Sequence, residues 1–140
     1  MPSRSSTKPR SGCPISLALE ILGDTWSLLI VRDLMFRGRR TFNEFLNAGE
    51  GIASNVLADR LSRLEKAGIV SKRRDVEDAR RFLYRLTPKG IDLAPAMVEL
   101  VQWTARYEKT DAPPRVVRAL RRNREGFLAQ IRATWAEANE

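Results

Sequence analysis

The 140-residue sequence contains no histidine and only one cysteine, Cys13. Histidine is the commonest general base in enzymes, so its absence excludes every His-dependent catalytic triad and argues against an enzyme. A single cysteine excludes a disulfide framework within the chain, and without histidine it leaves no zinc site. We therefore expect no catalytic residues, no metal and no cofactor.

Long hydrophobic runs are also absent. The longest apolar stretches, such as Leu28 to Val31, are far shorter than the roughly 18 residues that a membrane helix needs. No apolar stretch of the signal-peptide kind precedes Cys13, and residues 1–12 instead combine basic residues with serine, threonine and proline. We therefore expect a soluble, cytoplasmic protein without membrane contacts, and we interpret residues 1–12 as a flexible basic arm.

The sequence has an excess of basic residues over acidic ones. It holds 25 lysine and arginine residues against 17 aspartate and glutamate residues, which gives a formal net charge of +8. Such a chain is attracted to a polyanion, either nucleic acid or an anionic membrane. The length and the 43% hydrophobic content fit one globular core, and charge alone does not choose between the two polyanions.

Hydrophobic periodicity predicts two helices near the N-terminus. The first covers 14–22, where Pro14 suits the first helical position and Gly23 ends the apolar pattern. The second runs from a cap at Asp24 to about Phe36 and is apolar nearly all round. A helix of that kind belongs at the centre of the molecule.

Two further helices follow after a basic turn. Thr41 and Glu44 have the spacing of a capping box for a short third helix. Ser54 is a favoured N-cap for the fourth helix, which Gly68 ends. Apolar residues recur at helical spacing in that fourth helix and predict its buried side: Leu57, Leu61 and Leu64.

The period then changes to that of strands. Residues 69–74 and 80–86 predict two strands around a polar turn at 75–79. Phe82, Tyr84 and Leu86 alternate onto one face, as strand geometry requires of a half-buried strand. The pattern therefore predicts a β-hairpin.

The C-terminal part of the chain predicts helices again. Thr87 and Pro88 have the signature of a helix start, and Pro95 should kink or divide that helix. A final amphipathic segment extends from about 114 to 135. These helices have more apolar surface than one small domain can cover, which favours a homodimer, although the last helix could instead fold back over its own core. We expect the arginine run at 115–124 to face solvent.

The predicted fold is mainly α with a small β-hairpin wing, a winged helix-turn-helix with additional N- and C-terminal helices for dimerisation. The helix-turn-helix covers about 41–67 and the wing about 69–87. A helix fits the major groove of duplex DNA and a hairpin can lie along the neighbouring backbone, so this order favours double-stranded DNA as the partner.

The fourth helix is the predicted reading helix. Because its leucines face the core, the opposite surface would face base edges: Ser54, Asn55, Ala58, Asp59 and Ser62. Asn55 is the best candidate for base reading, since an amide matches the N6 and N7 edge of adenine, a pairing worth roughly 1 to 3 kcal/mol of discrimination. The side chains predicted to contact phosphates are basic: Arg63, Lys66, Lys72, Arg73, Arg74, Arg80 and Arg81.

Each assignment has an alternative. The basic strand residues could form a solvated face that protects a sheet edge, and Asn55 could be a polar first-turn residue without a base contact. The whole module could bind a protein instead of DNA, because a fold does not determine a function.

Seven short motifs between Cys13 and Gly90 stand in the order found in HxlR-type transcriptional regulators, and the chain resembles that family from Cys13 to Trp103. The motifs are Cys13-Pro14-Ile15, Gly23-Asp24-Thr25-Trp26, Phe42-Asn43-Glu44, Gly51-Ile52-Ala53, Leu61-Ser62-Arg63-Leu64-Glu65, Gly68-Ile69-Val70 and Leu86-Thr87-Pro88-Lys89-Gly90. The resemblance implies a dimeric winged-helix repressor or activator in a bacterial-type cytoplasm.

With this resemblance we assign residues 13–107 to the winged-helix domain and 108–140 to a C-terminal helical extension. Two reading helices related by a two-fold axis would address half-sites about one DNA turn apart in a near-palindromic operator.

Cys13 is a candidate redox sensor, because the resemblance implies that some relatives use a cysteine at this place to sense oxidants or electrophiles. A thiol just before a helix lies near the positive end of the helix dipole, and Arg10 is close in sequence, so both would favour the thiolate. With no second cysteine, the reversible products are a disulfide to the partner subunit or a small-thiol cap. The alternative is a small buried residue that packs the first helix.

Overall fold

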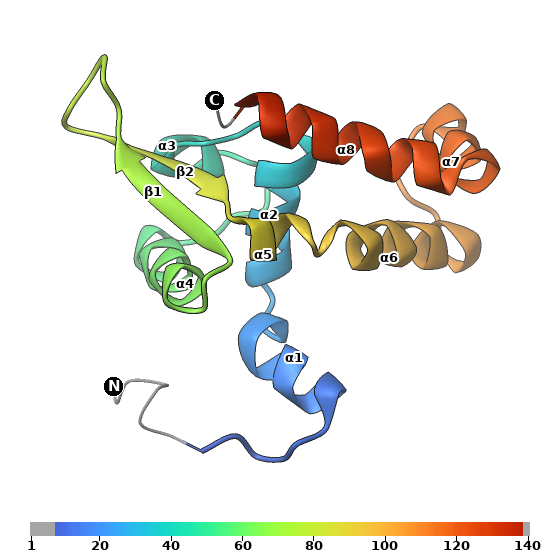
Figure 1. The fold of residues 1–140 in the computed structure, drawn as a ribbon, viewed down its shortest axis with the longest axis horizontal. Helices are drawn as coiled ribbons and strands as arrows, with labels where there is room; N and C mark the ends of the chain where they lie inside the picture. Colours follow the sequence, from blue (N-terminus) through green and yellow to red (C-terminus); the bar gives the residue numbers. More distant parts are fainter. Residues whose placement is uncertain (1–7, 139–140) are drawn as a thin grey trace.

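The computed structural model describes residues 8–138, so most of the predicted N-terminal arm lies outside the described residues. The elements follow the predicted order (Figure 1): α1 Pro14–Leu22, α2 Ser27–Phe36, α3 Phe42–Leu46, α4 Ser54–Lys66, β1 Val70–Arg74, β2 Phe82–Leu86, α5 Pro88–Ile91, α6 Ala94–Tyr107, α7 Pro114–Arg122 and α8 Arg124–Ala138. The predicted fold class, mainly helical with one hairpin, is confirmed.

Helix α2 lies at the centre of the molecule, between the hairpin with α4 on one side and α6 with α8 on the other (Figure 1). Its Ile30 and Val31 are buried, and the three predicted leucines of α4 are also buried. No single helix in the described part of the chain is long and apolar enough to cross a membrane; α1 and α2 meet that test only as a pair bent by 80°.

One predicted helix cap is confirmed and another is displaced, because α2 begins at Ser27 with Trp26 as its N-cap, two residues after Asp24. The Asp24 carboxylate accepts hydrogen bonds from the backbone N–H groups of Trp26 at 2.9 Å and Ser27 at 3.0 Å. Thr41 and Glu44 form the reciprocal capping box of α3. Both caps satisfy N–H groups that a helix start otherwise leaves without partners.

The predicted cap at Ser54 is wrong. Ala53 holds the N-cap position, with an extended backbone (φ −75°, ψ 147°), and makes no side-chain cap hydrogen bond. Its carbonyl accepts from the N–H of Leu57 at 2.9 Å, so Ser54 is already the first helical residue. The position at which the backbone becomes helical therefore decides the N-cap here, and it outweighs the preference of serine for that position.

The hairpin is antiparallel, with Val70 opposite Leu86 and Lys72 opposite Tyr84. Val70, Tyr84 and Leu86 are buried at its base, as the alternation predicts. The other edge of β2 is partly covered too, because the N–H of Tyr84 donates to the carbonyl of Arg40 at 2.8 Å. The strands are slightly shorter than predicted.

Pro95 marks a division, as predicted, since α5 ends at Ile91 and α6 begins at Ala94. The continuous helix expected at about 114–135 is wrong, because Asn123 separates α7 from α8. The Asn123 side chain accepts from the N–H of Gly126 at 3.0 Å. An asparagine that bonds the backbone three residues on favours a new helix start over a continuous helix.

Helix α8 folds back over its own chain (Figure 1), which resolves the alternative that the sequence left open. Ile131 is buried, and the indole N–H of Trp135 donates to the carbonyl of Leu86 at 2.8 Å. Arg132 also pairs with Asp92 at 2.7 Å. The last helix therefore covers the base of the hairpin and the start of α6.

Replacing Gly90 by alanine should destabilise this junction. A Cβ at Gly90 would lie 2.2 Å from the carbonyl oxygen of Ile69, a backbone atom that cannot move aside freely. We expect a loss of about 1–3 kcal/mol in the free energy of unfolding, measured by denaturant titration. Gly12→Ala is the control, because nothing lies within 4 Å of its added Cβ. Equal stability of the two variants would contradict the packing described here.

Candidate nucleic-acid interface

The outward side of α4 carries every residue predicted to read bases. The leucines at 57, 61 and 64 are at most 2% exposed and fix the inner side of the helix. Five polar or small side chains are exposed: Ser54, Asn55, Ala58, Asp59 and Ser62. The structure therefore brings the predicted reading residues together on one helix surface, and Lys66 extends that surface toward the C-terminal end of α4.

The basic residues of the hairpin divide between its two faces. Lys72 and Arg74 share a face with Phe82, and their charged groups lie 4.5 Å and 4.7 Å from the centre of its ring. Cation–π contacts of this kind order long side chains while leaving the charge near solvent. Arg73 and Arg85 project from the opposite face. The wing therefore presents positive charge on both sides.

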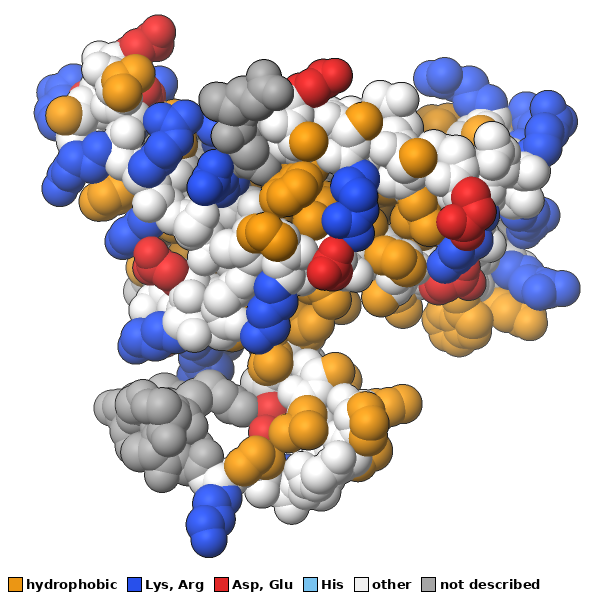
Figure 2. Space-filling model, in the orientation of Figure 1, with side chains coloured by type: hydrophobic (Ala, Val, Ile, Leu, Met, Phe, Trp, Pro, Cys, Tyr) orange, Lys and Arg blue, Asp and Glu red, His pale blue; other side chains and the backbone are white. Residues whose placement is uncertain are grey.

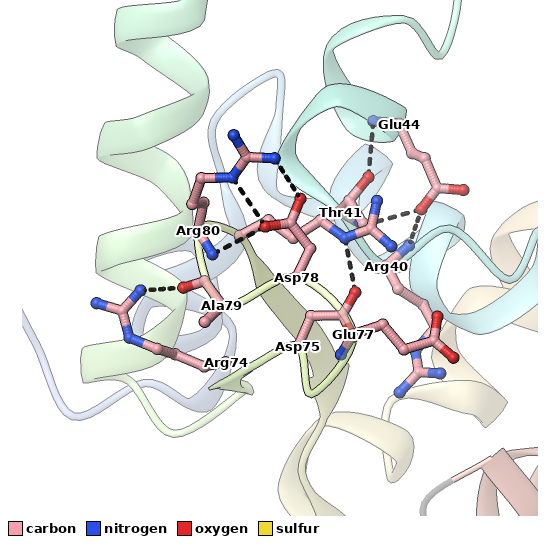
Figure 3. A network of polar contacts seen from close by, with 10 residues as sticks. Arg40, Thr41, Glu44, Arg74, Asp75, Glu77, Asp78, Ala79 and Arg80 are labelled. Atoms are coloured by element: carbon pink, nitrogen blue, oxygen red, sulfur yellow. Dashed lines mark hydrogen bonds and ion pairs between the residues drawn. The ribbon is translucent and has the colours of Figure 1, made fainter.

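Two arginines at the hairpin tip are bound to aspartates. Arg80 pairs with Asp78 at 3.0 Å (Figure 3). Arg81 pairs with Asp75 at 2.6 Å. The N–H of Glu77 and the Arg81 guanidinium together lower the pKa of Asp75. The side chain of Arg74 reaches the carbonyl of Ala79 at 2.6 Å. These contacts give the turn a defined shape, so Arg80 and Arg81 contribute first to the wing's own structure.

A groove of about 770 Å³ separates β2 from the start of α3. Arg40, Arg80 and Arg81 line it, together with Asn43 and Glu44. The Glu44 carboxylate accepts from the N–H groups of Arg40 and Thr41, both at 3.0 Å (Figure 3), and these bonds lower its pKa. Arg40 was not among the predicted contact residues, although the basic turn before α3 contains it.

An ion pair that the sequence did not predict joins α4 to α2. The Nε of Arg60 donates to Asp24 Oδ2 at 2.9 Å, the same carboxylate that caps α2. Burial is the strongest influence on Asp24 and raises its pKa, but the hydrogen bonds from Ser27, Trp26 and Arg60 together lower it. Asp24 therefore holds α4 against the first turn of α2.

Cys13 is exposed at the position before α1, so the alternative of a buried packing residue is wrong. Its N–H donates to the Ser11 hydroxyl at 3.2 Å. Among the described residues no group of three or more His, Cys, Asp or Glu side chains could hold a metal ion.

A protein-family model described as HxlR-like helix-turn-helix matches residues 21–112, which include α2 to α6 and therefore the whole candidate interface. The chain belongs to the HxlR family. An uncharacterised HTH-type transcriptional regulator of Mycobacterium tuberculosis is 38% identical over 104 residues, which are 74% of this chain and 65% of that protein. The HxlR chain thus spans slightly less than two thirds of that relative.

Solved structures of regulators share the fold. The oxidised form of the redox regulator HypR superimposes with a TM-score of 0.62 at 26% identity, over 70% of this chain and 100% of that one. The reduced form of YodB from Bacillus subtilis gives a TM-score of 0.57 at 29% identity, over 69% and 95%. The family consists of transcriptional regulators, and α7 and α8 lie beyond the matched residues of this HxlR protein.

Asp24→Asn should destabilise the fold in a pH-dependent way. Because the folded-state pKa lies below the unfolded value of about 3.9, the carboxylate contributes fully above that pH and loses its contribution as pH falls through the lowered pKa. We expect a loss of about 1–2 kcal/mol at pH 7 that shrinks below about pH 4, measured by denaturant titration at each pH. Asp111→Asn, at an exposed aspartate, is the control. A constant difference across pH would contradict the role of the charge.

Proposed function

We propose that this HxlR protein is a cytoplasmic homodimer that binds a near-palindromic DNA operator and regulates transcription of the adjacent genes. The observation that carries the proposal is the exposed outer side of α4 beside a basic hairpin, in a family of transcriptional regulators. The family gives no reason to propose catalysis. Residues 13–107 would form the DNA-binding domain and 108–140 the extension that supports it.

In this proposal α4 enters the major groove and the wing follows the flanking backbone. Asn55, in the first turn of α4, reads a base, and its neighbours Ser54, Ala58 and Ser62 lie close to the groove floor. Lys66 and the exposed wing residues Lys72, Arg73 and Arg74 contact phosphates. Arg80 and Arg81 reach the backbone only from within their ion pairs with the tip aspartates.

Exposed apolar side chains support the homodimer. Helices α1 and α6 carry large hydrophobic residues that their own chain does not cover: Ile15, Leu19, Leu100, Trp103 and Tyr107. Figure 2 shows hydrophobic side chains gathered on α1 and below the far end of α6. Groups of exposed apolar side chains can mark interaction surfaces in soluble proteins. We therefore assign the dimer contact to α1 and α6, while α8 covers its own core.

Two substitutions test DNA reading and backbone binding separately. Asn55→Ala should relax the preference at one base position, because only a base contact carries sequence information. Arg73→Ala should weaken binding to all sequences and reduce the slope of log affinity against log salt by about 0.9 for its lost phosphate contact. Each variant is the control for the other, and both effects are measured by titrating duplexes selected from a random library. If the protein selects no sequence, a protein-binding module becomes the better account.

Trp103→Asp should weaken the dimer. Trp103 is 64% exposed in the single chain, so the change should leave the fold intact while placing a charge in the contact. Loss of a central aromatic contact costs about 2 kcal/mol, close to a 30-fold rise in the dissociation constant, measured by sedimentation velocity. Val76→Asp is the control, because Val76 is 90% exposed at the wing tip. An unchanged dimer in the Trp103 variant would contradict the assigned surface.

Sedimentation velocity of the protein treated with an oxidant extends the test to Cys13. This thiol directly precedes α1, which we assign to the dimer contact, so a disulfide to the partner subunit would act through that contact. A covalent dimer that is absent in Cys13→Ser supports redox control. DNA binding that oxidant leaves unchanged in the unaltered protein argues against it.

A further inference from the structure

We propose that the outer side of α7 is a second DNA-binding surface, which contacts the phosphates of a duplex segment other than the one that α4 and the wing contact. The inference goes beyond the proposed function, because no residue of α7 belongs to the proposed interface. Helix α7 also lies beyond the residues that the HxlR family model matches.

Arginine dominates the composition of α7. Four of its nine residues are arginines, and no acidic residue stands between positions 112 and 124. Three of the four lie on one side of the helix, because a spacing of three and then four residues stacks them about one turn apart. We call these three exposed residues the arginine row: Arg115, Arg118 and Arg122.

Packing of the opposite side of α7 fixes the direction of the arginine row. Leu120 is buried there, and Val116 and Val117 are half-buried, where α7 packs against α6 and α8. The row therefore points away from the molecule, and the small exposed Ala119 shares its side of the helix. Figure 2 shows Lys and Arg side chains gathered over α7.

The charges of the arginine row are not neutralised within residues 8–138. No carboxylate of that range lies within 4.0 Å of the three guanidinium groups, and the glutamates of α6 and α8 that are nearby in the fold bind another residue. Glu99 and Glu125 both pair with Arg124, at 2.6 Å and 3.0 Å. The arginines of the hairpin tip, in contrast, are bound to aspartates. The row thus presents its full charge to solvent.

The stability of α7 does not account for the whole row. Arg122 lies in the last turn, where a cation is favourable to the helix dipole. Arg115 lies in the first turn, where the same dipole disfavours a cation and where α7 has no acidic residue. An explanation from helix stability therefore covers one end of the row and not the other.

The chemistry of this side of α7 suits a nucleic-acid backbone better than a protein partner. The core of a stable protein interface is apolar, and the only apolar group beside the row is the methyl group of Ala119. Each strand of a duplex carries a phosphate about every 3.4 Å along the axis, so arginines about 5.4 Å apart each have a phosphate within reach. Such contacts need charge and not a particular base sequence.

The position of α7 determines which DNA it can contact. Helix α7 lies at the opposite end of the molecule from the hairpin (Figure 1). A straight duplex that lies along α4 and the wing therefore does not reach the arginine row of the same chain. The row contacts a second duplex segment, so that the protein connects two segments of DNA.

Capture of a second duplex tests the inference. The full-length protein is first saturated with a short immobilised duplex of the sequence that it selects from a random library, and a labelled, unselected duplex is then added. We expect the labelled duplex to be captured, with a slope of log affinity against log salt of about 0.9 for each arginine that contacts a phosphate.

Replacing the whole row by glutamine, as Arg115→Gln, Arg118→Gln and Arg122→Gln together, should abolish this capture. Binding to the selected duplex should stay unchanged, because the three side chains are exposed and glutamine is also a good helix former. Replacing the same three residues by lysine should preserve capture, since lysine keeps the charge that a phosphate contact needs.

Arg121→Gln is the matched control on the same helix. Arg121 is exposed, but it lies to one side of the arginine row, one turn from the half-buried Val117. Its replacement removes the same charge and should lower capture much less than Arg118→Gln does.

The inference is overturned if the unaltered protein captures no second duplex, or if the triple glutamine variant still captures it. It is also overturned if the row binds polyglutamate but no duplex, because its partner is then an acidic protein. A protein that selects no sequence refutes the proposed function alone. In that case the row is tested by binding to unselected duplex, which the triple glutamine variant should weaken far more than Arg121→Gln.

Discussion

The carboxylate of Asp24 is the contact on which the placement of α4 depends. It caps the first turn of α2 through two backbone N–H groups and binds Arg60 of α4 with the same oxygen. Helix α2 is the central packing element, so whatever is fixed to its first turn is fixed to the core. The leucines of α4 determine which side of that helix faces inward, and the ion pair adds a directional contact between the two helices. The leucines therefore orient α4, and the ion pair between Asp24 and Arg60 fixes its position against α2.

The wing depends on contacts from segments that precede and follow it in the sequence. The carbonyl of Arg40, before α3, accepts from the N–H of Tyr84, and the indole of Trp135, near the end of α8, donates to the carbonyl of Leu86. An isolated two-stranded hairpin is marginal in water, so these neighbours explain how a short one holds its shape. The extension beyond the family match therefore has a structural role at the base of the hairpin.

Sequence patterns predicted what depends on near neighbours in the chain. The leucine stripe of α4, the Thr41–Glu44 capping box, the hairpin and the division near Pro95 all arise from residues a few positions apart, and the structure confirms them. The link between Asp24 and Arg60 joins residues 36 positions apart, and the Trp135 bond spans 49. No local period encodes such pairs. The break at Asn123 was missed for another reason, since the amphipathic pattern continues through it and only the side-chain cap reveals it.

The positive charge of this protein is less available than its formal value suggests. At the wing tip Arg80 and Arg81 are bound to Asp78 and Asp75, and on α4 Arg60 and Arg63 share Asp59. Paired arginines add little to long-range attraction, because the field of each is largely cancelled by its partner. The formal net charge of +8 therefore overstates the field that the hairpin tip and α4 present to a polyanion.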